Sequence, residues 1–303
     1  MNQSRIGFAS AILLLLGSCS TEPVPQADEN DPCGNAARPQ YNITVFLDLS
    51  DRIDTSWSYT PQWQLDTAVV MSIVERFRED TKVRKTYCAE GMIRFRADPP
   101  NPALNPCISS TEVDFSPLKT ADRAGLWKGM SAQWRSCLEG TYLAALEEGK
   151  RTHWPGSNVW GFMRDVDSFM KPGYRNILIV LTDGEPYYEG NAKVEQGMEW
   201  ANITSTRLKP YAKGSEEASL DALRKAGVKI MNPRATKTEL DGLEVLVLGV
   251  RPSDPKNAHI FPMLQYLWSD LFQQMGIDSS RIFIQKAGTT ADAKDAVKRF
   301  FSH

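Results

Sequence analysis

Two polar stretches of this chain carry side chains suited to binding a cation. Asp48 and Ser50 follow the apolar run ITVFL, and Asp183 follows the run ILIVLT. Burying carboxylates and hydroxyls costs free energy unless a hydrogen-bond donor or a cation pairs with them. Their oxygens are also the ligands that hard divalent cations such as Mg²⁺ prefer. The sequence therefore predicts one polar site made by both stretches, filled by a metal ion or by hydrogen bonds.

Four short apolar runs, including these two, are predicted strands. The first three are nearly continuous rather than alternating, which is typical of strands buried on both faces of a parallel sheet. Helix candidates lie between the runs and show apolar residues at helical spacing. The predicted strands are residues 43–47, 177–181, 245–250 and 281–285, and the predicted helices are residues 62–80, 159–170, 215–226, 261–275 and 291–301.

This alternation predicts an α/β fold with a doubly wound, mostly parallel sheet and one antiparallel edge strand. Residues 83–96 are interpreted as the edge hairpin, with its tight turn at the sequence AEG. Residues 98–153 fit the alternation poorly, because they contain several prolines. They are interpreted as an insertion that is helical at residues 141–150.

The predicted fold brings the polar stretches together. In open α/β sheets, ligands bind beyond the carboxyl ends of the strands, where the strand order reverses. Asp48 and Asp183 meet there if their strands are neighbours. A third element is the helix that opens at GSNVWGF, where Ser157 either caps the helix or faces the crevice. Thr141 competes with Ser157 as the hydroxyl ligand, but it lies much further from Asp183 along the chain.

These motifs resemble those of the von Willebrand factor A family. Its members carry Asp-x-Ser-x-Ser after the first strand, a threonine in a later loop, and the aspartate of a TDG sequence after the fourth strand. Together these residues form a metal-ion-dependent adhesion site. By this resemblance, Asp48 and Ser50 match the first two positions, Ser157 stands at the threonine position, and Asp183 matches the last. The resemblance covers about residues 41–303, without the insertion.

The resemblance implies a site for Mg²⁺ or another divalent cation, with one open position that an acidic residue of a protein partner fills. It also implies that the first and fourth strands are neighbours. Arg52 departs from the family pattern, because it stands at the second serine position. Arginine is permanently charged and cannot accept a hydrogen bond. Either Arg52 turns away and a metal binds with one hydroxyl fewer, or Arg52 pairs with Asp48 or Asp183 and replaces the ion.

The chain lacks the common catalytic layouts. It has no G-x-S-x-G elbow, P-loop or G-x-G-x-x-G loop. A phosphoester hydrolase with Asp48 as its nucleophile is an alternative, although the sequence DLS lacks the second aspartate of the phosphoaspartate enzymes. Asp51, Asp54 and Glu185 are interpreted as solvated charges or caps. We therefore expect a non-enzymatic protein-binding module, or alternatively a metal-free scaffold of the same fold in an envelope complex.

The N-terminus has the layout of a secretory signal, with one cation, an apolar core and small residues near Cys19. The sequence LGSC resembles the lipobox of bacterial lipoproteins, in which cleavage precedes a lipid-modified cysteine. We expect a signal peptide over residues 1–18, a tether over residues 19–40 and the domain over residues 41–303. Ser20 after the cysteine favours, by resemblance to known sorting rules, lipid anchoring at the outer membrane of a bacterial envelope.

The net charge and the cysteine content limit which binding partners and which cellular compartment we expect for this protein. The net charge of −2 leaves no basic excess for nucleic-acid binding. Four cysteines follow Cys19, and their spacing does not match a zinc site. In an oxidising compartment they are expected to form two disulfides in one of three pairings, with Cys88–Cys107 favoured by proximity in sequence. The other two are Cys33 and Cys137.

Overall fold

The computed structural model describes part of the chain, and several predictions fall outside it. The predicted signal peptide, the predicted lipidation site Cys19 and Arg52 lie outside the described residues. No helix among those residues has both the length and the apolar character needed to cross a bilayer. The elements belong to one compact unit, Arg38–His303. The described residues are 33, 39–50, 62–85, 88–99, 105–149, 155–234 and 240–303.

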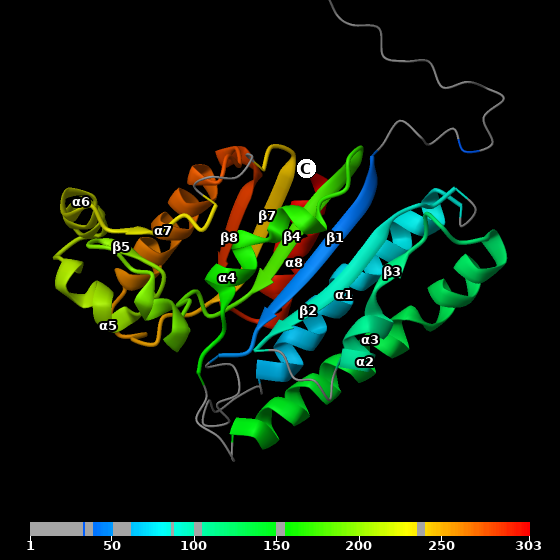
Figure 1. The fold of residues 1–303 in the computed structure, drawn as a ribbon, viewed down its shortest axis with the longest axis horizontal. Coiled ribbons are helices and arrows are strands. Elements are labelled where there is room, and N and C mark those ends of the chain that lie inside the picture. Colours follow the sequence, from blue (N-terminus) through cyan, green and yellow to red (C-terminus); the bar gives the residue numbers. More distant parts are fainter. Residues whose placement is uncertain are drawn as a thin grey trace, which may run out of the picture. The chain divides into compact units, whose positions relative to one another are not determined.

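The centre of the unit is a mixed, mostly parallel sheet with the strand order β3-β2-β1-β4-β7-β8. All neighbouring strands are parallel except β3, which runs antiparallel to β2. Figure 1 shows β1 between β2 and β4. A separate two-stranded sheet joins β5 to β6. The strands are β1 (Gln40–Asp48), β2 (Met92–Asp98), β3 (Val113–Asp114), β4 (Tyr174–Leu181), β5 (Glu199–Trp200), β6 (Lys229–Ile230), β7 (Leu243–Val250) and β8 (Ile282–Lys286).

Helices connect the strands. Predicted helix ends are confirmed at α6, where Ser215 caps the N-terminus and Gly227 ends the helix at φ +70°. The helices are α1 (Gln62–Val83), α2 (Asn105–Thr111), α3 (Thr120–Gly149), α4 (Val159–Arg164), α5 (Ser205–Leu208), α6 (Glu216–Ala226), α7 (Ile260–Gln274) and α8 (Thr290–Ser302), with 3-10 turns η2 (Val166–Phe169), η3 (Glu189–Lys193), η4 (Lys209–Tyr211) and η5 (Ser279–Arg281).

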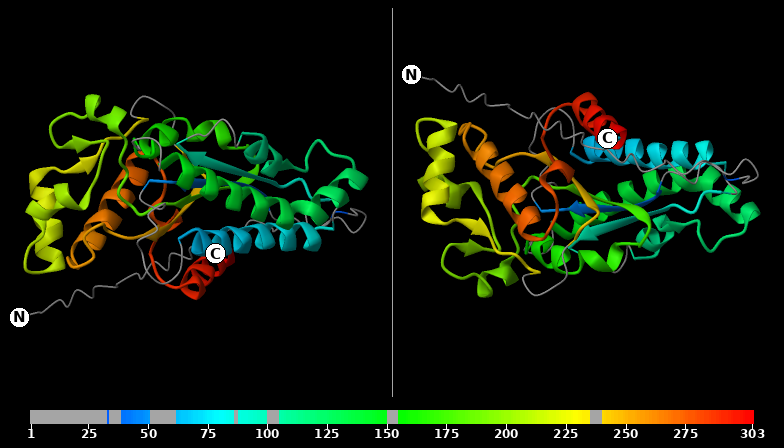
Figure 2. Two further views of the ribbon diagram at one scale, coloured as in Figure 1. Left: turned by 90° about the horizontal axis from the view of Figure 1, so that it is seen from below. Right: turned by 90° about the horizontal axis from the view of Figure 1, so that it is seen from above.

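Residues of the central strands alternate between two hydrophobic cores. Val45 and Leu47 of β1 pack in a core with side chains of α1, α3 and α8. Phe46, between them, packs in a second core with side chains of α4, α6 and α7. Figure 2 shows α1 and α8 side by side. Because β1 and β4 are buried on both sides, their sequences read as continuous apolar runs.

The predicted edge hairpin within residues 83–96 is wrong. Its second half is β2, which runs parallel to β1, and its antiparallel partner is β3, from the segment interpreted as an insertion. Gly91 does not mark a hairpin turn. A Cβ there would lie 2.9 Å from the Phe77 ring and 3.2 Å from the Tyr41 carbonyl oxygen, so glycine permits a close approach of chain segments.

The same segment contributes a long helix to the first core. The sequence predicted helix only at residues 141–150, whereas α3 has 30 residues. Trp134, Leu138 and Tyr142 of α3 are buried in the core that also contains side chains of α1. The Tyr142 hydroxyl donates a short hydrogen bond to the buried Asp66 carboxylate of α1. The segment therefore covers one face of the sheet.

The favoured disulfide pairing is wrong, although two disulfides are present. Cys107 of α2 bonds to Cys137 of α3, with their Cα atoms 5.4 Å apart. Cys33 and Cys88 are also disulfide-bonded. Cys88 precedes β2 and Cys107 follows it, and a seven-residue strand spans roughly 20 Å. Proximity in sequence was therefore a poor guide, because β2 holds these two cysteines apart.

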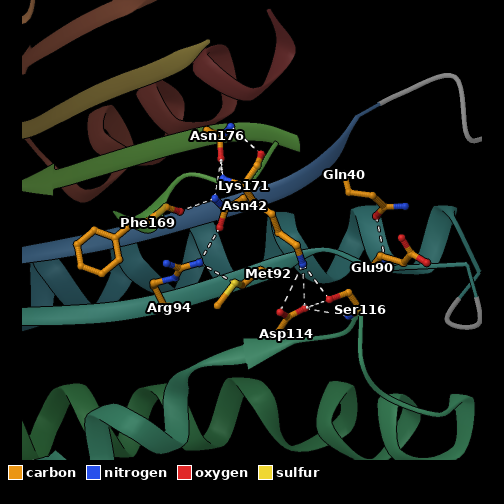
Figure 3. A network of polar contacts seen from close by, with 10 residues as sticks. All are labelled: Gln40, Asn42, Glu90, Met92, Arg94, Asp114, Ser116, Phe169, Lys171 and Asn176. Carbon is orange, nitrogen blue, oxygen red and sulfur yellow. Dashed lines mark hydrogen bonds and ion pairs between the residues drawn. The ribbon is translucent and has the colours of Figure 1, made fainter. Parts of the chain in front are cut away.

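A polar network joins β1, β2 and β4 near their amino ends (Figure 3). The Asn42 amide donates to the Phe169 carbonyl and to Asn176 Oδ1, at 2.6 Å each. The buried Arg94 donates to Asn42 Oδ1 at 2.9 Å. Burial of Arg94 lowers its pKa from the usual value. The network fixes one end of the sheet, and the predicted site lies at the other end.

Candidate functional site

The candidate site lies at the carboxyl ends of β2, β1 and β4. β1 and β4 pair in parallel, with Leu47 opposite Leu181. The predicted neighbours are therefore confirmed, and Asp48 and Asp183 follow adjacent strands at one edge of the sheet. On the other side of β1, Asp98 at the end of β2 stands opposite Asp48. Three carboxylates thus follow one another across adjacent strands.

The Asp48 carboxylate links the two predicted loops. It is fully buried. Its Oδ1 accepts hydrogen bonds from the Ser50 hydroxyl at 2.6 Å and the Ser50 N–H at 2.9 Å. Its Oδ2 accepts one from the Thr182 hydroxyl at 2.7 Å. The bond from Thr182 joins residues that lie far apart in the sequence, so the site depends on the pairing of β1 with β4.

The hydrogen bonds within the Asp48–Ser50 pair are not by themselves evidence of a functional site. The same Asp-x-Ser arrangement occurs at Asp278 and Ser280, where the serine hydroxyl and N–H donate to Asp278 Oδ1 at 2.6 and 2.8 Å. Ser280 is exposed, whereas Asp48 and Ser50 are buried. What distinguishes the Asp48 pair is its burial and its contact with a second loop.

Ser157 lies in the site, as predicted. Its hydroxyl oxygen accepts hydrogen bonds from the N–H groups of Leu49 and Ser50 at 3.1 and 3.0 Å, and it donates to the Asp98 carbonyl at 2.6 Å. A serine hydroxyl can donate one hydrogen bond and accept two, so the Ser157 hydroxyl makes all the hydrogen bonds that it can. Ser157 therefore holds the turn after β1 in place. Thr141, the competing residue, lies within α3 and donates to the Cys137 carbonyl.

The loop that presents Ser157 depends on a glycine. Gly156 has φ +84°, a conformation that residues with a Cβ rarely adopt. A Cβ at Gly156 would lie 2.1 Å from the Tyr187 carbonyl oxygen. That oxygen accepts the N–H of Ser157 at 2.9 Å, and Glu189 N–H donates to the Pro155 carbonyl at 3.0 Å. The chain after β4 thus supports the loop before α4.

The turn after β4 is fixed from several sides. Asp183 Oδ1 accepts the N–H of Glu185 at 2.8 Å, and the Asp183 carbonyl accepts the N–H of Arg251 at 2.6 Å. Gly184 has φ +88°, and a Cβ there would lie 2.5 Å from Val250 Cγ1. Glycine is required because the turn packs against the end of β7.

Glu185 is a buried cap rather than a solvated charge. Its side chain is 4% exposed. It accepts hydrogen bonds from the hydroxyl and N–H groups of Ser205 and Ser253. Ser205 is the first residue of α5, so the cap interpretation holds and the solvated interpretation is wrong. Asp51 and Asp54 lie outside the described residues.

Asp98 is a site residue that the sequence reasoning missed. Burial raises the pKa of its carboxyl group, the N–H of Asn158 at 2.5 Å opposes that rise, and the nearby Asp48 adds to it. Its signal was the acid that ends the sequence IRFRAD. In the sequence that acid stands at the start of an apparent insertion, and only the pairing of β2 with β1 places it opposite Asp48.

The donor set around Asp48 suits a hard divalent cation. Asp48, Ser50 and Asp183 offer only oxygen ligands, and such ligands match Mg²⁺. The Ser50 hydroxyl donates a hydrogen bond to Asp48, which leaves the lone pairs of the Ser50 oxygen for a cation. Within the described ranges, no three side chains of histidine, cysteine, aspartate or glutamate are grouped to hold a metal. From the described residues alone, an ion here would therefore be held by carboxylates together with hydroxyl groups or water.

Comparisons with known proteins add little. No protein-family model matches the sequence, and no curated protein does. A similar solved structure is the pilus adhesin SpaC from Lactobacillus rhamnosus GG in its open conformation, with a TM-score of 0.41 and 12% sequence identity. The match covers 88% of this chain, which spans only 30% of the adhesin chain. A likeness this distant supports no conclusion about function.

Proposed function

We propose that residues 38–303 form a protein-binding module of the von Willebrand factor A type, with a doubly wound sheet. The strand order and the two cores on either side of β1 support the fold. The observation that carries the function is the hydrogen bond from Thr182 to Asp48. It unites two strand-end turns into one buried polar site at the edge where α/β sheets bind ligands.

Asp48, Ser50 and Asp183 are the residues that would hold a divalent cation such as Mg²⁺. When bound, the ion supplies a positive charge that attracts an acidic side chain of a protein partner. Ser157 positions the turn that carries Ser50, and it would have to give up a hydrogen bond to become a ligand. Arg52, from outside the described residues, either turns away from the ion or replaces it.

The second candidate is a metal-free scaffold of the same fold. It is favoured by the hydrogen bonds that already satisfy Ser157 and both oxygens of Asp48. The same contacts weigh against a phosphoester hydrolase. A nucleophilic carboxylate must reach its substrate, whereas Asp48 is fully buried.

The proposed setting is the envelope of a bacterial cell, with the chain anchored through Cys19 at the outer membrane and engaged in binding rather than catalysis. The signal-like N-terminus and the lipobox-like LGSC sequence support this setting. The disulfides of the domain fit an oxidising compartment. Labelled palmitate incorporated by the wild type and lost in Cys19→Ala would support anchoring, and unchanged incorporation would reject it.

A capture experiment separates the two candidate functions. The full-length chain would be used to capture proteins from a native envelope extract, in Mg²⁺ and in excess EDTA. Metal-dependent binding predicts that a specific partner is lost in EDTA and in Ser50→Ala, but kept in Ser280→Ala. The last variant removes the matched serine of the exposed Asp-x-Ser pair. Capture that is unchanged in EDTA would favour the metal-free scaffold.

A further inference from the structure

Arg94 of β2 is a buried cation whose hydrogen-bond partners are all neutral. It is 6% exposed, and it donates to Asn42 Oδ1 at 2.9 Å and to the sulfur of Met92, which is a weak acceptor (Figure 3). Within the described part of the chain, no carboxylate pairs with Arg94, and its Nε has no hydrogen-bond partner. Arginine stays charged, and burying a charge without a counter-charge is costly.

The acidic side chains that act on Arg94 are already paired with other cations. Burial lowers the pKa of Arg94, and the attraction of Glu112 and Asp114 does not offset this effect. Glu112 accepts a hydrogen bond from Arg96 at 2.8 Å, and Asp114 lies 3.4 Å from the Lys171 ammonium. Three cations therefore share two carboxylates, which leaves one positive charge in excess at this edge of the sheet.

The alternation of β2 places Arg96 on the same face of the sheet as Arg94. Ile93 and Phe95 lie in the first core, so the two arginines leave the strand on the opposite face. The buried residues described for the second core include none from β2, and this edge of the second face is polar. Alternate residues of a strand lie about 7 Å apart, so the two guanidinium groups are neighbours.

The Phe169 ring holds both guanidinium groups. Their central carbons lie 5.4 Å and 5.5 Å from the ring centroid, for Arg94 and Arg96 respectively. An aromatic face attracts cations but supplies no counter-charge. The Arg96 side chain is 31% exposed, so the pair of guanidinium groups has a side that is open to solvent. An anion that binds both groups would reduce the repulsion between them.

Arg94 also has hydrogen-bond donors to spare. A guanidinium carries five N–H groups in one plane. Both hydrogen bonds of Arg94 start from Nη2, so among the described contacts the N–H groups of Nε and Nη1 are unused. Carboxylates and phosphates accept two parallel N–H groups of a guanidinium. The unused donors of Arg94 therefore match the oxygens of such a group.

We propose that Arg94 and Arg96 form a binding site for an oxyanion, the carboxylate or phosphate type of group that guanidinium recognises. One negative charge on this group balances the excess positive charge. Arg94 stands opposite Thr44, four residues before Asp48 on β1, so the site lies roughly 13 Å from Asp48 along the sheet. It is separate from the proposed cation site and does not depend on it.

The test is thermal unfolding of the full-length chain in detergent and EDTA, with millimolar sodium phosphate replacing sodium chloride at constant ionic strength. The wild-type midpoint should rise with phosphate, because the anion binds the folded state. Each of Arg94→Met and Arg96→Gln should raise the phosphate concentration needed for a given shift at least about tenfold. The control Arg224→Met removes an exposed guanidinium that lies 5.0 Å from the Tyr266 ring centroid, and it should keep the wild-type response.

Two further anions identify the source of the oxyanion. Sulfate and N-acetylglutamate methylamide, whose only charge is the side-chain carboxylate, are titrated in the same way. A shift with phosphate and sulfate alone supports a site for a free tetrahedral anion. A shift with the carboxylate compound alone supports a site for an acidic side chain of a protein.

Several results would overturn the proposal. If none of the three anions raises the wild-type midpoint, no oxyanion site is present. Phosphate and sulfate also stabilise proteins without binding a specific site, and equal shifts in the wild type and the arginine variants would reveal that effect. In chloride alone, Arg94→Met should unfold no earlier than the wild type, because an apolar side chain replaces an uncompensated charge. If Arg94→Met does not fold, the comparison of Arg96→Gln with Arg224→Met decides.

Discussion

Replacing Gly156 with alanine is expected to destabilise the protein much more than the same change at Gly173. Both glycines have similar positive φ values, +84° and +79°. Alanine at such a position costs about 1–2 kcal/mol. Reduced freedom of the unfolded chain offsets about 0.4–1 kcal/mol at both positions. These terms cancel in the difference, so the comparison isolates the surroundings of each glycine.

The surroundings differ sharply. A Cβ at Gly173 meets nothing within 4 Å, whereas one at Gly156 would lie 2.1 Å from the Tyr187 carbonyl oxygen. That oxygen must move, and the hydrogen bond from the Ser157 N–H is lost, at a net cost of about 0.5–1.5 kcal/mol. Displacing Ser157 also breaks its contacts to the turn after β1. We expect Gly156→Ala to cost about 2–3 kcal/mol more than Gly173→Ala.

Urea unfolding of the full-length chain, followed by tryptophan fluorescence with the disulfides intact, measures this difference. The denaturant slopes should match the wild type, so that a shift in midpoint reports stability. Equal costs for the two variants would refute the reasoning, because they would mean that the 187–189 segment does not support the Ser157 loop.

Three further predictions concern a disulfide, the site residue Asp98 and a helix cap. Replacing Cys107 and Cys137 with serine should cost about 3–4 kcal/mol, because the disulfide closes a loop with a sequence separation of 30. Asp98→Asn should stabilise the protein at neutral pH in EDTA, because the buried carboxylate has a raised pKa and its charge opposes folding. Thr289→Ala should cost about 1 kcal/mol, because it removes the capping box of α8.

Each of the three predictions can be checked by a control measurement. Reduction of the wild type, which also breaks the disulfide bonds of Cys33 and Cys88, should cost at least as much stability as the cysteine variant. The gain in Asp98→Asn should shrink as the pH falls toward the unfolded-state value of about 3.9, since the carboxyl group becomes neutral in both states. A gain that is constant with pH would contradict the assigned cause. Ser302→Ala, at the other end of α8, should change stability much less than Thr289→Ala.

Features that depend on local pattern could be predicted from the sequence. The continuous runs around Val45 and Ile179 indicated strands buried on both faces, and Ser215 and Gly227 marked the ends of a helix. The turns that carry Asp48 and Asp183 follow adjacent strands at one edge of the sheet, as expected from the rule for strand ends together with the strand order that the family resemblance implies.

Other features depend on tertiary contacts that no local pattern reveals. Gly125, Gly129 and Gly140 interrupt the apolar pattern of α3, and the helix forms because Trp134 and its neighbours pack on α1 and β2. Gly91 resembled a turn residue but serves a close approach. Asp98 became a site residue only through the parallel pairing of β2 with β1.

We propose that the Asp48 and Asp183 turns hold a cation between them. Calorimetric titration of the full-length chain with Mg²⁺ and Mn²⁺ tests it most directly. We expect one site per chain, weakened at least about tenfold in Ser50→Ala and Asp183→Asn and unchanged in Ser280→Ala. No binding by the wild type, or binding that persists unchanged in Asp183→Asn, would contradict the claim.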